Sequence, residues 1–212
     1  MSKKGCFITF EGIDGCGKTT QMELLQKYLE NHKGLTVLKT REPGGKGLGE
    51  EVRKLLLNYD GEVSPKCESF LFLADRAQNI DIIVNPAIER GEVVLCDRHT
   101  DSTIAYQGFG RGVNIEELKK LNDLATGGKK PDLTIVFDID VETSMKRVGK
   151  ARDRMEESGE KFFEAVRLGY LEIANSEPER VKVIDATQTI EEIHEQVVSL
   201  FEGLWGADVV CL

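Results

Sequence analysis

Apolar positions along the chain follow two kinds of pattern. Five short runs are continuously apolar, which is typical of strands covered on both faces, as in parallel sheets. They lie at residues 6–10, 35–38, 93–96, 133–139 and 181–184. Between several of them, apolar residues recur every three or four positions, as in helices with one buried side. This alternation predicts an α/β fold in three layers, a parallel five-stranded sheet with helices on both of its faces.

Two helix starts are visible in the sequence. Asn114 and Glu117 have the spacing of a capping box ahead of a helix at 115–125. Ser64 followed by Pro65 is the order favoured at a helix N-terminus. The expected inward stripes consist of Met22, Leu25 and Leu29 in a helix at 18–32, and Ile115, Leu118, Leu121 and Leu124 in the helix at 115–125.

One segment, at about 147–160, departs from both patterns. It reads "RVGKARDRMEESGE" and is charged, with almost no large apolar side chain. It is either a solvated surface loop or a mobile lid that carries Arg147, Arg152 and Arg154. Because no repeat, linker or shift in composition divides the rest, we expect residues 1–212 to form a single domain.

Composition narrows the classes of function. The chain has 212 residues and a formal net charge of −9, which disfavours general nucleic-acid binding because that relies on clustered Lys and Arg. Its five cysteines are scattered without a C-x-x-C pair, so we expect no zinc site and no disulfide framework. No apolar run is long enough for a signal peptide or a membrane span. These features predict a soluble cytoplasmic protein.

The first apolar run is followed by a glycine-rich loop that carries recognisable chemistry. The loop fits G-x-x-x-x-G-K-[ST], with a strand expected before it and a helix after it. Glycines allow successive backbone N–H groups to surround a phosphate, and the helix N-terminus adds positive potential. In such a loop Lys18 spans the β- and γ-phosphates and Thr19 binds Mg²⁺. The residues of this predicted nucleotide site are Gly12, Ile13, Asp14, Gly15, Cys16, Gly17, Lys18, Thr19 and Thr20.

A P-loop alone does not name a reaction. The N-K-x-D sequence by which GTPases read guanine is absent. Three further clusters carry candidate ligand-binding residues. Two follow predicted strands, at the carboxyl ends where ligands of open α/β sheets gather, and one lies on a predicted helix. They are Arg41 and Glu42 in "TREPGG", Phe72 and Arg76 in "FLFLADRAQ", and Asp97 and Arg98 in "VVLCDRHTDSTIAYQG". Together they indicate a small phosphorylated acceptor, with Asp97 as a candidate for ordering Mg²⁺ water.

The motifs, taken in order, resemble the bacterial-type thymidylate kinases, a family of P-loop nucleoside monophosphate kinases. The stretches are "FEGIDGCGKTTQ", "TREPGG", "FLFLADRAQ", "DRHTDSTIAYQG", "DRMEESGEKFFEAVRLGYLEIA" and "VIDATQTIEEI", and they run nearly end to end. The resemblance implies that ATP and Mg²⁺ convert dTMP to dTDP, a step of dTTP biosynthesis in both de novo and salvage routes. It also implies a homodimer, to which the apolar faces of 66–88 could contribute.

The resemblance also implies roles for individual residues. Phe72 stacks on thymine, Arg76 donates to a base carbonyl, and Tyr106 crowds the 2′ position of the sugar. Arg98 clamps the monophosphate, with Asp14 arranging Mg²⁺ and phosphate. Glu42 is expected to fix the Arg98 region or the sugar, and Gln107 to assist at the nucleotide rim. The remaining implied contacts are Ser102 and Thr103 at the base edge and Gln188, in "DATQ", beside the adenine of ATP.

The expected phosphoryl transfer needs no general base. A monophosphate has a second pKa of about 6, so its attacking oxygen is already anionic at neutral pH. The P-loop has no arginine at its variable positions, so positive charge is expected from Lys18, Arg98 and the lid arginines. Two other readings remain open: another small-acceptor P-loop kinase, such as a deoxynucleoside or adenylate-type kinase, and a nucleotide-binding switch without an acceptor.

Overall fold

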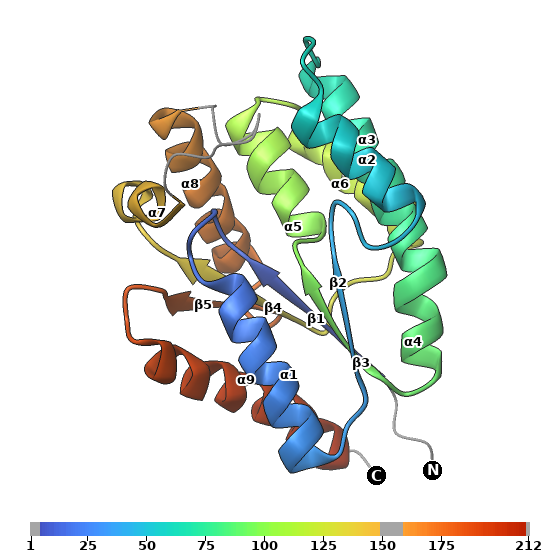
Figure 1. Cartoon of the computed structure of the whole chain (residues 1–212), viewed down its shortest axis with the longest axis vertical. Helices are drawn as coiled ribbons and strands as arrows, with labels where there is room; N and C mark the ends of the chain where they lie inside the picture. Colours follow the sequence, from blue (N-terminus) through green and yellow to red (C-terminus); the bar gives the residue numbers. More distant parts are fainter. Residues whose placement is uncertain (1–4, 149–158, 211–212) are drawn as a thin grey trace.

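The computed structural model describes residues 5–148 and 159–210, apart from the side chains of 207–210. A five-stranded parallel sheet has the order β2-β3-β1-β4-β5. The strands are β1 (Cys6–Glu11), β2 (Val37–Arg41), β3 (Val93–Asp97), β4 (Leu133–Asp138) and β5 (Val181–Asp185). The helices are α1 (Lys18–Lys33), α2 (Leu48–Asn58), α3 (Pro65–Asn79), η1 (Ile80–Val84), α4 (Asn85–Glu89), α5 (Thr100–Thr103), η2 (Ile104–Gly110), α6 (Ile115–Thr126), α7 (Val141–Val148), α8 (Glu160–Ser176) and α9 (Ile190–Val210), where η marks a π-helix. The predicted α/β class and parallel sheet are confirmed (Figure 1).

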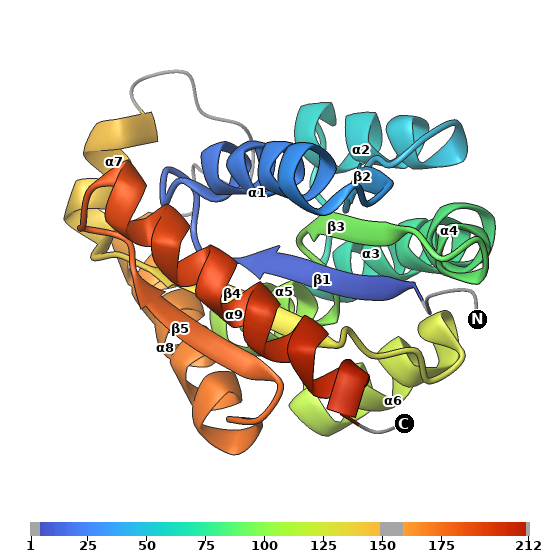
Figure 2. The same cartoon turned by 90° about the horizontal axis from the view of Figure 1, so that it is seen from below.

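Helices cover the sheet on both faces. Figure 2 shows α1 and α9 on one side, and α3, α4, α5 and α8 on the other. The two sides of β1 explain this division, because successive side chains point in opposite directions. Ile8 and Phe10 are buried in a cluster with Leu25 of α1, whereas Phe7 is buried with Ile80 and Val84 of η1.

Local signals from the sequence mostly place the helices where they were expected. The Ser64 side chain accepts a hydrogen bond from the Cys67 N–H, and that of Asn114 accepts one from the Glu117 N–H. Leu118 is fully buried, as predicted, but Leu124 is 80% exposed, so the expectation that it belongs to the inward stripe was wrong. No helix within the described ranges combines the length and apolarity needed to cross a membrane.

Strand boundaries differ most at β2. A strand was expected at 35–38, but it runs from Val37 to Arg41 and ends in polar residues. Gly34 closes α1 in the left-handed conformation (φ 61°), and the Leu35 N–H still bonds back to the Leu29 carbonyl, so the start of the apolar run belongs to the helix exit. The strand therefore lies further along, and its backbone pairs with β3 up to Arg41 opposite Asp97.

The parallel arrangement places the functional loops together. The carboxyl ends of all five strands meet at one edge of the sheet, and the chain order reverses around β1, which lies between β3 and β4. The glycine loop leaves β1 at this point. The segments after β2 and β3 open at the same edge, so the fold brings the predicted motifs to one place.

Candidate active site

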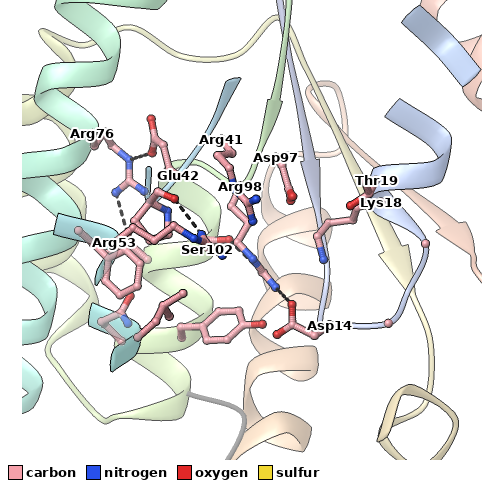
Figure 3. Close-up of a pocket in the computed structure, with 18 of the residues that line it drawn as sticks. Asp14, Lys18, Thr19, Arg41, Glu42, Arg53, Arg76, Asp97, Arg98 and Ser102 are labelled. Carbon is pink, nitrogen blue, oxygen red and sulfur yellow. Dashed lines mark hydrogen bonds and ion pairs between the residues drawn. The ribbon is translucent and has the colours of Figure 1, made fainter. Parts of the chain in front are cut away.

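A cavity of about 410 Å³ lies at this edge of the sheet. It extends from the glycine loop to the side of α3, with the ends of β2 and β3 between them (Figure 3). Most of the predicted site residues line it: Asp14, Gly15, Gly17, Lys18, Thr19, Thr20, Glu42, Phe72, Arg76, Asp97, Arg98, Ser102, Thr103, Tyr106, Gln107 and Arg147. Residues from five separate stretches of sequence therefore share one space.

The glycine loop has the backbone of an anion site. Gly17 caps α1 with φ 94° and no side-chain hydrogen bond, which leaves the first-turn N–H groups available to a ligand. A Cβ on Gly12 would lie 2.6 Å from the Phe137 carbonyl oxygen, so only glycine fits there. The Ile13 and Cys16 side chains are buried in the core, so a contribution from these two residues to phosphate binding falls to their backbone.

The Lys18 ammonium is folded back over the loop. Its Nζ donates to the carbonyl oxygens of Gly12 at 3.0 Å and Ile13 at 3.1 Å. Figure 3 shows Lys18 and Thr19 together at one side of the cavity. A phosphate that enters the loop offers this cation an anionic partner in place of two neutral carbonyls.

Arg98 links the end of β3 to the glycine loop. Its guanidinium donates to Asp14 Oδ1 at 2.8 Å and to the Gly12 carbonyl at 2.9 Å, and it lies 4.8 Å from the centre of the Tyr106 ring. Burial acts to raise the pKa of the Asp14 carboxyl, but Arg98 and Lys18 outweigh it and lower the pKa. Arg98 also has a positive φ of 70°, which is unusual for a side chain of this size. The backbone therefore holds this cation beside the loop at a conformational cost.

A buried carboxylate behind Arg98 was not singled out from the sequence. Glu11, the last residue of β1, accepts hydrogen bonds from the His99 N–H at 2.7 Å, the Ser102 hydroxyl at 2.6 Å and the Tyr170 hydroxyl at 2.9 Å. Burial, together with the charge of Asp101, raises the pKa of Glu11 to about 7. A glutamate that ends an apolar run just before the glycine loop was the available signal.

The far end of the cavity is built around an ion pair. Arg76 donates from Nε to Glu42 Oε2 at 2.8 Å, and both side chains are buried. Glu42 also accepts from Asn79 at 2.8 Å and lies 3.1 Å from His99 Nδ1. Burial acts to raise the pKa of Glu42, but His99 and Arg76 outweigh it and hold the pKa at about 2. Glu42 thus fixes Arg76 and also contacts His99, the neighbour of Arg98, which agrees with the expectation that it fixes the Arg98 region. The ion pair with Arg76 was not predicted, and a contact with the sugar stays a prediction.

Side chains suited to a planar base surround Arg76. Phe72 lies one turn before it on α3, and Thr103 accepts from Arg76 Nη1 at 2.6 Å. The Tyr106 hydroxyl is buried without a hydrogen-bond partner among the described residues. Gln107 is 1% exposed and lines the cavity, and its contact with the rim of the nucleotide stays a prediction.

The cavity carries more positive charge than the motifs alone predicted. Arg41, noted in the sequence without a role, lines it, and so does Arg53 of α2, which was missed. Arg53 donates to the Pro43 carbonyl at 2.9 Å. No motif surrounds Arg53, so only the packing of α2 reveals it. Cations from several elements thus converge in a chain whose net charge is −9.

The lid arginines divide into one described and two undescribed residues. Arg147 lies in α7 and donates to the carbonyl oxygens of Gly15 at 3.4 Å and Ala186 at 3.2 Å. Arg152 and Arg154 lie outside the described residues, as does most of the predicted lid. Gln188 follows β5, donates to the Asp185 carbonyl, and is not part of the cavity lining. Of the predicted lid arginines, the described one, Arg147, thus lies against the glycine loop.

Comparison with known proteins decides between the families that share a P-loop. The thymidylate kinase family model matches residues 10–197. The chain belongs to the thymidylate kinase family.

Individual thymidylate kinases match over nearly their whole length. The enzyme of Pelotomaculum thermopropionicum is 47% identical over 208 residues, covering 96% of each chain. The enzyme of Desulfovibrio desulfuricans is 46% identical over 207 residues, covering 93% of this chain and 95% of its own. The crystal structure of thymidylate kinase from Ehrlichia chaffeensis superposes with a TM-score of 0.77 at 37% identity, covering 93% of this chain and 99% of that one.

Proposed function

We propose that this thymidylate kinase uses one cavity to hold ATP and dTMP while the γ-phosphoryl group passes between them, forming dTDP and ADP. One observation carries the proposal: the P-loop residues at one end and Phe72 and Arg76 at the other line the same cavity, with Arg98 between them (Figure 3). Family membership supports the choice of dTMP as acceptor.

The donor end uses backbone amides and one lysine. The glycine loop and the first turn of α1 receive the phosphates, and the Lys18 ammonium leaves the carbonyls of Gly12 and Ile13 to pair with them. Arg147, held beside Gly15, supplies charge at the transferring group. Arg152 and Arg154 remain candidates for the same task, and Gln188 for the border of the adenine site.

The acceptor end holds both the base and the monophosphate. Arg98 exchanges part of its pairing with Asp14 for the monophosphate, and Phe72 offers its ring to thymine. The bonds described for Arg76 use four of its five N–H groups, which leaves one for a base carbonyl. Tyr106 is proposed to crowd the 2′ position, and Ser102 and Thr103 to border the base.

The chemical step runs without a protein base. The dTMP phosphate is dianionic near neutral pH and attacks directly. His99 is fully buried and not part of the cavity lining, so it is not placed to accept a proton from substrate. The chain's contribution is to align two polyanions and balance their charge.

The residues present fit Mg²⁺. Asp97 has a buried carboxylate oxygen without a hydrogen-bond partner among the described residues, and Thr19 places a hydroxyl on the same cavity. Hard oxygen donors of this kind suit Mg²⁺, with ATP phosphates and water completing its shell. Within the described ranges no group of three or more acidic, His or Cys side chains is placed to hold a metal alone. We propose that Thr19 and Asp97 would hold the ion, with Asp14 assisting, and that it would supply positive charge to neutralise the phosphates.

The wider expectations stand as proposals. We infer a single catalytic domain, a cytoplasmic enzyme and a homodimer. For the dimer, the exposed side chains of Phe70 and Ile82 lie in the 66–88 segment, so this part of the surface has apolar groups to cover.

A panel of acceptors tests the proposed function. We expect ADP release from ATP and Mg²⁺ with dTMP, weaker release with dUMP, and none with thymidine or AMP. Lys18→Ala should reduce the dTMP rate by about 10³-fold while retaining the native circular dichroism spectrum. Turnover of thymidine would indicate a nucleoside kinase, and ATP binding without product from any acceptor would indicate a switch.

A further inference from the structure

Glu68 is a buried carboxylate that the proposed mechanism does not use. It lies in the first turn of α3 and is 1% exposed, although glutamate is rarely buried without a reason. Glu68 precedes Phe72 by four residues and Arg76 by eight, so all three lie along one side of the helix. The stripe that carries the base-stacking ring and the base-reading guanidinium therefore also carries this carboxylate.

Glu68 contacts the amide of Gln107. Gln107 Nε2 donates to Glu68 Oε1 at 2.9 Å, and both side chains are 1% exposed. A carboxylate accepts hydrogen bonds but cannot donate them, so it can face only the NH₂ end of the amide. The opposite end, the Oε1 acceptor, is consequently directed away from Glu68, and Gln107 lines the cavity.

The carboxylate is itself held in place. Arg111 Nε lies 3.4 Å from the same Glu68 oxygen, and its guanidinium carbon is 4.4 Å from the centre of the Phe162 ring. The ion pair and the ring contact offset part of the cost of burying the charge. Residues from α3, η2, the turn after η2 and α8 thus hold the NH₂ end of the Gln107 amide against Glu68.

We propose that Glu68 is a positioning residue that fixes the Gln107 amide with its acceptor toward the base, and so favours a base with an N–H at position 3. Thymine has this N–H, whereas cytosine has a bare nitrogen there and would require the amide to turn over. The two orientations of a glutamine amide have nearly the same shape, so packing alone does not choose between them. The inference rests on the proposed function and identifies what sets the preference at that site.

Glu68→Gln tests the orientation because it keeps the size and offers either a donor or an acceptor to Gln107. We expect the ratio of kcat/KM for dTMP over dCMP to fall about tenfold, roughly the effect of one charge-assisted hydrogen bond. The KM for dTMP should rise, whereas kcat and the KM for ATP should stay within about twofold. Glu116→Gln on α6, an exposed glutamate paired with Lys119, removes the same charge and should leave the ratio unchanged.

A reciprocal exchange separates orientation from packing. In the double variant Glu68→Gln, Gln107→Glu, the residue at position 107 is an acceptor at both ends and the one at 68 can donate to it. We expect the dTMP:dCMP ratio to recover to at least the wild-type value, whereas Gln107→Glu alone, which faces two carboxylates toward each other, should lose dTMP affinity.

Two results would overturn the inference. One is a folded Glu68→Gln enzyme whose ratio stays within twofold of wild type. The other is a double variant no better than Gln107→Glu alone, and this comparison decides the matter if Glu68→Gln does not fold. Failure of the wild-type enzyme to phosphorylate dTMP would instead reject the proposed function, before any variant is measured.

Discussion

Arg76 serves the fold and the site at once. Its guanidinium is 1% exposed and bonds to Glu42, Thr103, Asn122 and the His99 carbonyl. These partners come from the end of β2, from α5, from α6 and from the turn after β3. A group held by four elements has little freedom to adapt to a ligand, so its one remaining N–H has a fixed direction.

Arg76→Ala should therefore have two measurable effects. The Kd for dTMP should rise at least about 100-fold while the Kd for ATP changes less than threefold, because the P-loop end is untouched. Calorimetric titration with each nucleotide checks this. The free energy of unfolding should also fall by about 3–5 kcal/mol, since the buried Glu42 carboxylate loses its guanidinium partner and keeps only Asn79 and His99.

Asn79→Ala is a suitable comparison, because it removes another donor to Glu42 without removing the guanidinium. It should destabilise the fold by about 1–3 kcal/mol and leave the preference between dTMP and ATP nearly intact. Equal weakening of both nucleotides by Arg76→Ala would contradict the base-reading role.

At the residue scale, the sequence predicted which residues line the cavity better than which residues they contact. Lys18, Arg76 and Arg98 were found because motifs mark them. The ion pair between Glu42 and Arg76 was not predicted, and Arg53 was missed, because such contacts arise from packing between elements far apart in the chain. Hydrogen-bond partners of this kind leave no periodic trace in the sequence.

Among the elements, α8 approaches η2 unusually closely. A Cβ on Gly169 of α8 would lie 2.8 Å from the Phe109 ring and 3.1 Å from Ala105 Cα. This contact holds the π-helix that carries Tyr106 and Gln107. Tyr170, the residue after Gly169, bonds through its hydroxyl to Ser102 and Glu11. The glycine is what allows the two helices to meet at this distance.

Gly169→Ala should destabilise the protein by about 1–3 kcal/mol through overpacking, even though alanine is the better helix former. Thermal or urea unfolding measures the effect. Gly203→Ala is the matched control: Gly203 lies in α9, is exposed, and a Cβ there meets no atom within 4 Å. It should stabilise the protein by about 0.5–1 kcal/mol. If both substitutions stabilised the protein, packing at Gly169 would not be tight.

The sequence predicted which elements exist but not all of their geometry. The glycine loop, the strands and the capped helices α3 and α6 follow from local chemistry. The π-helical segments η1 and η2 were not predicted, because a change from i→i+4 to i→i+5 bonding leaves the apolar pattern almost unchanged. Yet η2 carries Tyr106 and Gln107, so the position of two cavity residues depended on this unpredicted feature.

For the whole molecule, the free energy of unfolding should depend on pH through the buried carboxyl group of Asp75. Burial and the nearby Glu42 raise the pKa of Asp75 to about 7. Asp75 Oδ1 accepts from the Gly44 N–H at 3.0 Å, but its Oδ2 is buried without a partner among the described residues. An aspartate in the unfolded chain has a pKa of about 3.9, so the folded state binds this proton more tightly. The contribution is complete below pH ~4 and is lost as the pH rises through 7.

Asp75→Asn should remove this loss, because asparagine cannot ionise and still offers an acceptor to Gly44. Relative to wild type, the variant should gain about 2 kcal/mol more stability at pH 8 than at pH 5, since one pKa unit corresponds to about 1.4 kcal/mol. Urea unfolding at both pH values gives the difference.

Asp123→Asn, at an exposed carboxylate of α6, provides the control and should change stability by less than about 0.5 kcal/mol at either pH. A gain for Asp75→Asn that is the same at pH 5 and pH 8 would mean that the carboxyl does not titrate between them.

The alignment of Glu68, Phe72 and Arg76 along α3 has a consequence for how this sequence can diverge. Each residue added to or removed from an α-helix turns everything beyond it by about 100°. A single-codon insertion or deletion between positions 68 and 76 would therefore separate the carboxylate from the guanidinium, however mild the inserted residue. The turn at 127–132 has no helical register to preserve, so insertions and deletions should be tolerated there and selected against in α3.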